Sequence, residues 1–210
     1  MKKSIAALIL VMVLVAFSGC VDSLIGKPQV VPTTATLAPT PLPTTENPSS
    51  TVPVADMALQ LPDLPPDYIL RDRSVMIRPE VSELTRDLGW RQGYFVSFYR
   101  LNAEKDDLTR IRQSISLFAL ENMKKVFDIE KEDLDSQAVS PVMLDEMPFP
   151  PIGSRSVAYR QTDPTDSLHV TTYTVIFTKK NIFETVTMSG TTTDYELLKD
   201  VVQKAAAKIQ

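Results

Sequence analysis

Cys20 is the only cysteine of the 210-residue chain, and it directly follows a segment typical of exported proteins. Lys2 and Lys3 precede an apolar run at residues 5–17, and the small residues Ser18 and Gly19 separate this run from the cysteine. A basic start, an apolar stretch and a small-residue cleavage site make up a secretory signal peptide. The chain has no second thiol for a disulfide, so its exported part must be stabilised by a hydrophobic core.

Residues 15–20, VAFSGC, resemble the lipobox of prokaryotic lipoproteins. The resemblance implies that residues 1–19 are a lipoprotein signal peptide and that Cys20 receives a lipid containing palmitate. Residues 20–27 are then the lipidated N-terminus, and membrane lipid is a partner of the chain through Cys20. Phe17 departs from the motif, because an aliphatic residue is commonest at that position.

The alternative interpretation of the same segment is an uncleaved membrane span. The apolar run at residues 5–17 is shorter than the roughly 20 residues that a spanning helix needs, which favours lipidation. A two-chain lipid would hold the protein stably at the membrane. Under either interpretation we expect the bulk of the chain to be extracytoplasmic.

Residues 28–55 have the composition of a disordered linker. They contain seven prolines, seven threonines, no aromatic residue and the single charge of Glu46. Such a segment buries too little apolar surface to offset the entropy of ordering it, so we expect an extended tether. Threonine beside proline is also the composition of O-glycosylated stalks, and that alternative stays open.

The charge of the chain disfavours nucleic acid as a partner. The formal net charge is −4, and removing residues 1–19 takes away two lysines and no acid, which leaves about −6. Binding to phosphate backbones needs clustered positive charge, so we expect no nucleic-acid partner.

Residues 56–210 predict one globular domain of class α+β. Alternating or β-branched segments predict strands at residues 68–77, 94–101, 108–118, 154–161, 168–178 and 182–189. Apolar stripes predict helices at residues 79–88, 120–127 and 193–209. Strands joined in hairpins and interrupted by amphipathic helices favour an antiparallel sheet packed on one face by helices.

Several landmarks of this domain resemble the PsbP/Mog1/LpqN-like domains of exported prokaryotic lipoproteins. They are LGWRQGY at residues 88–94, PIG at residues 151–153, VIFTKKNIF at residues 175–183, and the terminal helix. The resemblance implies a PsbP/Mog1-like fold with an accessory or binding role, and it carries no catalytic residue over to this chain.

The sequence offers little for catalysis. It lacks a nucleophile elbow, paired histidines and a phosphate-cradling glycine loop, and His169 is expected inside a strand. The acidic residues between Asp128 and Asp135 favour a solvated helix end over a metal site, because they lack the glycine of a calcium loop. We therefore predict no catalytic residue, no cofactor and no metal site.

The predicted function is that of a membrane-anchored, surface-exposed lipoprotein with a non-catalytic binding or accessory domain. An envelope protein or a small ligand is the expected partner. Two alternatives stay open: an extracytoplasmic hydrolase that uses carboxylates, and a solute-capturing lipoprotein. Convergent acids with raised pKa values would favour the hydrolase, whereas an apolar groove without titratable acids would favour binding.

Overall fold

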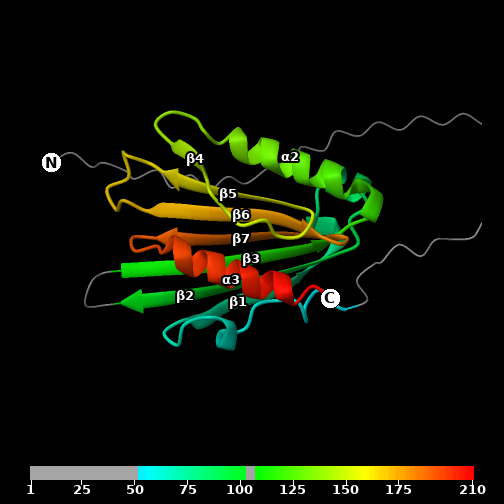
Figure 1. The fold of residues 1–210 in the computed structure, drawn as a ribbon, viewed down its shortest axis with the longest axis horizontal. Coiled ribbons are helices and arrows are strands. Elements are labelled where there is room, and N and C mark those ends of the chain that lie inside the picture. Colours follow the sequence, from blue (N-terminus) through cyan, green and yellow to red (C-terminus); the bar gives the residue numbers. More distant parts are fainter. Residues whose placement is uncertain (1–51, 103–106) are drawn as a thin grey trace, which may run out of the picture. The chain divides into compact units, whose positions relative to one another are not determined.

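The computed structural model of the chain describes residues 52–102 and 107–210 (Figure 1). The signal peptide, Cys20 and nearly all of the linker lie outside these residues, so their predictions stay predictions. Within the described residues, no helix is long and apolar enough to cross a membrane.

The described residues form a seven-stranded sheet in the order β1-β2-β3-β7-β6-β5-β4, and every neighbouring pair is antiparallel. The strands are β1 (Ile69–Met76), β2 (Gln92–Asn102), β3 (Asp107–Leu117), β4 (Met143–Met147), β5 (Arg155–Thr162), β6 (Thr171–Lys179) and β7 (Ile182–Gly190). The α-helices are α1 (Glu83–Asp87), α2 (Met123–Asp135) and α3 (Tyr195–Ala207), and the 3-10 turns are η1 (Leu61–Asp63), η2 (Arg78–Glu80) and η3 (Leu120–Asn122). The antiparallel sheet and the α+β class are confirmed.

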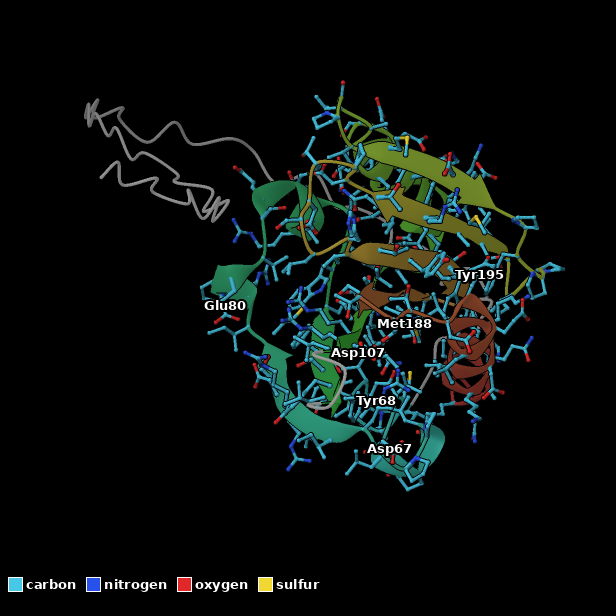
Figure 2. All side chains as sticks on the ribbon, turned by 90° about the vertical axis from the view of Figure 1, so that its left-hand side faces the viewer. Asp67, Tyr68, Glu80, Asp107, Met188 and Tyr195 are labelled. Atoms are coloured by element: carbon cyan, nitrogen blue, oxygen red, sulfur yellow. The ribbon has the colours of Figure 1, made fainter. Side chains whose placement is uncertain are left out.

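The two long helices pack on opposite faces of the sheet, whereas the sequence analysis expected helices on one face. Val175 and Phe177 of β6 belong to the core cluster that includes α3, and Ile176 between them belongs to the cluster that includes α2. Successive side chains of a strand point to opposite faces, so this continuous apolar run needs cover on both. Figure 2 shows α3, with its labelled Tyr195, on one side of the strands.

Strong alternation gave the best strand predictions. The residues of β3 alternate between buried and more exposed along the whole strand, as the sequence pattern predicts. Strand β6 starts at Thr171, later than expected, and His169 lies exposed in the preceding loop with a φ of 53°. The sequence analysis did not predict β4, because its residues fall between prolines and pair only with β5 at a sheet edge.

Two helix starts also differ from the prediction. Pro79 lies in η2, and α1 begins later, where the Ser82 hydroxyl accepts a hydrogen bond from the backbone N–H of Thr85. At α3 the N-cap is Asp194, whose carboxylate accepts from the N–H groups of Glu196 and Leu197. The helix therefore begins one to two residues after the predicted start at residue 193, at a carboxylate that pairs two of its first N–H groups.

The segment of residues 52–68, which we call the lead-in, is part of the core. Met57 is fully buried, and Val54 and Leu59 are almost so. Packing therefore begins before residue 56, the first residue that the sequence analysis assigned to the domain. The backbone N–H of Leu59 donates to Oε1 of Gln113 at 2.6 Å, which ties the lead-in to the middle of β3.

Truncating Leu198 tests the docking of α3. Leu198 is fully buried, whereas Gln203 on the same helix is exposed. We expect Leu198→Ala to lower the free energy of unfolding by about 2 to 5 kcal/mol, because it empties a packed site. The control Gln203→Ala should change it by no more than about 0.5 kcal/mol. Chemical denaturation measures both, and equal small effects would show that α3 is not docked.

Candidate binding groove

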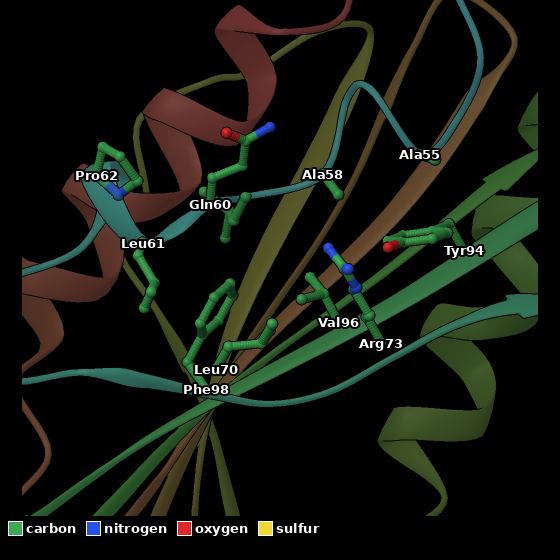
Figure 3. Close-up of a pocket in the computed structure, with 11 residues that line it drawn as sticks. Ala55, Ala58, Gln60, Leu61, Pro62, Leu70, Arg73, Tyr94, Val96 and Phe98 are labelled. Carbon is green, nitrogen blue, oxygen red and sulfur yellow. The ribbon is translucent and has the colours of Figure 1, made fainter.

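Two adjoining cavities form a groove between the lead-in and the strands β1 and β2. The first has a volume of about 350 Å³ and the second about 420 Å³. Ala55 and Tyr94 line both cavities, so the two adjoin at these residues. Figure 3 shows the first cavity, with Ala55, Ala58 and Leu61 of the lead-in on one side and the strands on the other.

The strand side of the groove follows from register. Tyr94, Val96 and Phe98 are alternate residues of β2 and share one face. Leu70 and Arg73 of β1 pair with Phe98 and Val96, and a register shift between residues 70 and 72 lets both lie over that face. The bulge therefore brings an apolar and a cationic side chain of the edge strand into the same cavity.

The charged groups that line the groove are all arginines. Arg73 lines the first cavity, and Arg78 and Arg91 line the second. In the part of the chain that the structure describes, none of their guanidinium groups forms a hydrogen bond or an ion pair, and no acid lines either cavity. Figure 3 shows the side chain of Arg73 extending from β1 toward the lead-in. The groove is thus apolar with unpaired positive charge.

Exposed apolar side chains of β1 continue the groove surface. Leu70 and Val75, which line the two cavities, are 40% and 63% exposed, although they lie on an edge strand of the sheet. Exposed edges with apolar side chains are a liability that proteins usually blunt, so their retention here favours an interaction surface.

The most strongly perturbed carboxyl group lies in the core and lines neither cavity. Glu184 of β7 is fully buried, and the side-chain amide of Gln113 donates to its Oε1 at 2.5 Å. Burial raises the pKa of Glu184 to about 8, and the hydrogen bond from Gln113 opposes this only in part. The acid is therefore neutral at physiological pH, and its role is structural.

The acidic residues of α2 are separate from the groove. Asp128 forms an ion pair with Arg155, and Asp135 accepts from Lys131 at 2.9 Å and from the hydroxyl of Tyr159 at 2.7 Å. These contacts hold α2 against β5. Nowhere in the described ranges do three or more potential metal-ligating His, Cys, Asp or Glu residues gather.

A further acid of α2 also has a perturbed pKa. Burial and the neighbouring Asp133 raise the pKa of Glu130. Among the interactions of the described residues, none links Glu130 with Glu184, and the two belong to a helix and a strand on different packing surfaces. The acids with raised pKa values therefore do not converge on one site.

Three large apolar residues that could have formed a recognition surface have structural positions. Met147 and Phe149 are half-buried and pack on the core beside α3. The buried Trp90 donates from Nε1 to Oγ of Ser116 at 3.3 Å, and its ring also borders the second cavity. The sequence analysis missed the lead-in wall of the groove, although the apolar residues between Met57 and Leu61 were a usable signal.

The sequence of the chain matches no protein-family model and no curated protein. In structure the chain is similar to the extracellular domain of PknH from Mycobacterium tuberculosis, with a TM-score of 0.46 and 10% identity over 68% of this chain and 81% of that chain. It is also similar to an uncharacterized protein from Mycobacterium smegmatis, the Rv0999 ortholog, with a TM-score of 0.44 and 11% identity over 78% of this chain and 98% of that chain. Similarity at this level establishes no family membership.

The buried acid predicts a specific dependence of stability on pH. The pKa of Glu184 in the folded state, about 8, exceeds the ordinary value of 4.5. Between these values the unfolded chain has lost a proton that the folded chain keeps, so stability should fall as pH rises, by up to about 1.4 kcal/mol per pH unit.

The variant Glu184→Gln isolates this effect, because its amide has the shape of the protonated acid and does not titrate. We expect the wild type and the variant to differ little near pH 5 and the variant to become the more stable one as pH approaches 8. Denaturant unfolding at several pH values measures the difference. Parallel pH profiles would contradict a raised pKa.

Proposed function

We propose that the chain is an exported lipoprotein, anchored to the membrane through Cys20, whose α+β domain is a non-catalytic binding module. The groove between the lead-in and β1–β2 takes an elongated, mainly apolar ligand that carries a negative charge. The observation that carries this proposal concerns the described residues that line the groove, which combine apolar side chains with three unpaired arginines and include no acid.

The size of the groove fits this role. Each cavity lies within the roughly 300 to 1,000 Å³ of ordinary ligand sites. Burial of an apolar chain against Leu61, Leu70 and the ring of Tyr94 supplies affinity, and the guanidinium of Arg73 supplies a partner for a carboxylate. An acidic ligand is favoured over a basic one, since the groove offers no anion to a cation.

A carboxylate-based hydrolase has less support. Acid catalysis of this kind needs two carboxyl groups facing each other across a cleft. The acids with raised pKa values in the described residues, Glu130 and Glu184, do not meet, and Glu184 lies in the core. A solute-capturing lipoprotein is a variant of the binding proposal and differs from it only in the fate of the ligand.

The anchor and the family are part of the same proposal. The VAFSGC motif supports lipidation at Cys20, and the proline- and threonine-rich segment supports display of the domain away from the membrane. A place among the PsbP/Mog1/LpqN-like domains is supported by the motifs at residues 88–94 and 175–183, which lead into β2 and form the β6–β7 hairpin.

Blocking the groove tests the binding proposal. Ala55 is exposed and lines both cavities, so Ala55→Trp should fill the groove without entering the core. We expect labelling by a photoreactive long-chain fatty acid to fall about tenfold. The full lipidated chain in liposomes is the sample, and mass spectrometry maps the labelled peptides.

The matched control for this experiment is Ala138→Trp. Ala138 is also exposed, but it lies after α2 and lines neither cavity. The control should keep the labelling of peptides from the lead-in, β1 and β2. Equal labelling of both variants, or labelling spread over the whole domain, would refute the groove as the ligand site.

Replacing the cysteine tests the anchor. In Cys20→Ser, the thiol that would receive the lipid is gone, so we expect the loss of metabolic palmitate labelling and the accumulation of unprocessed precursor. The wild type should be labelled and smaller by the mass of the signal peptide. A mature-sized, membrane-bound product from Cys20→Ser would rule out lipidation at this residue.

A further inference from the structure

A separate cavity, outside the groove, lies on the opposite face of the sheet. It has a volume of about 130 Å³, and its lining includes Arg71, Arg110 and Arg112 together with the buried Ser97. Register explains the gathering: Ser97 of β2 pairs with Arg112 of β3, and Arg110 lies two residues earlier on the same face. Arg71 stands at the bulge of β1, next to the pair of Asp72 with Ser97.

The three guanidinium groups have no anionic partner. In residues 52–102 and 107–210, none of them forms an ion pair or a hydrogen bond, and the Nε of Arg110 is buried without an acceptor. Asp72 is the one acid that lines this cavity, and it pairs with none of them. A buried donor without an acceptor is costly, so a ligand with acceptor oxygens would be stabilised at this site.

The electrostatics of the site agree with this deficit. Burial lowers the pKa of Arg110, and the charges of Arg112 and Arg71 lower it further. Like charges held together in this way repel each other. The cluster is a local excess of positive charge in a chain whose net charge is negative. A bound anion would remove both the repulsion and the unmet donor.

Arg110 also borders a neighbouring cavity of about 360 Å³, whose lining includes Leu108, Leu168 and Val170. Leu168 is 65% exposed, and Leu108 is 39% exposed. A cationic site therefore continues directly into an apolar surface, with Arg110 at the junction.

We propose that the cluster of Arg71, Arg110 and Arg112 is an oxyanion site for a phosphate or sulfate group, whose apolar substituent lies across Leu108 and Leu168. Guanidinium groups present paired N–H donors that match tetrahedral oxyanions, which is why arginine is the usual residue at such sites. This site is independent of the groove, because it uses the other face of β1–β3.

Titration with two probes tests the site and the source of its ligand. Inorganic phosphate represents the free anion, and hexyl phosphate represents a monoester with an apolar chain. The full lipidated chain in a non-ionic detergent is titrated with each probe by calorimetry. We expect both to bind and hexyl phosphate to bind more tightly, because its chain contacts the leucines.

Two double variants distinguish specific binding at this site from a general effect of the protein's net charge. Arg110→Gln with Arg112→Gln should weaken both probes about tenfold to a hundredfold, as expected for lost charge-assisted hydrogen bonds. Lys124→Gln with Lys125→Gln removes the same charge from exposed positions of α2 that line neither the groove nor this site, and it should leave binding unchanged. If the first pair does not fold, the single variant of the exposed Arg112 gives the same comparison.

Leu168→Ser tests the apolar extension. It should reduce the affinity for hexyl phosphate to that for inorganic phosphate and leave the latter unaltered. Equal affinities for the two probes in the wild type would overturn the extension and keep the oxyanion site. No binding of either probe, or equal losses in the arginine pair and the lysine pair, would overturn the site itself.

Discussion

The groove depends on a short chain of buried hydrogen bonds through Gln113. Its Oε1 accepts from the backbone N–H of Leu59, and its amide donates to Glu184. The first bond holds the lead-in over the sheet, and the second fixes the orientation of the Gln113 amide, because both polar ends have a partner. Without this link the backbone N–H of Leu59 would be an unpaired donor in the core, and apolar packing of residues such as Met57 would have to hold this wall of the groove at the cost of that donor.

The half of the sheet formed by β1–β3 has a different surface on each face. On one face the lead-in packs over Val96 and Phe98, which are buried, and the space beside them is a groove with arginines at its walls. On the other face α2 packs over β6 and β7, so polar and cationic side chains of β2 and β3 remain accessible around Arg112. The strands β1–β3 thus present a surface with arginines on each face. Both surfaces stay accessible because α2 and α3 pack mainly over β6 and β7.

Local patterns predicted most of the elements, and long-range pairing decided what they could not predict. The alternation in β3 and the polar turn at Lys180 and Asn181 are local, so strand and hairpin were evident from sequence. The cover on both faces was encoded in the continuous apolar run of β6, but one face was expected because the helices carry no mark of the face that they cover. The cluster of Arg71 with Arg110 requires the order of β1, β2 and β3 and a bulge, neither of which the sequence states.

Glu184 forms the inner end of this hydrogen-bond chain. Leu59, which lines the first cavity, is connected to this acid through the two hydrogen bonds of Gln113. Burial raises the pKa of Glu184 to about 8, so at neutral pH the protonated form predominates. A neutral acid accepts the hydrogen bond of the Gln113 amide without placing a full charge in the core, where an unpaired carboxylate would be costly. The chain of hydrogen bonds therefore positions the lead-in wall of the groove and adds no net charge to the interior at neutral pH.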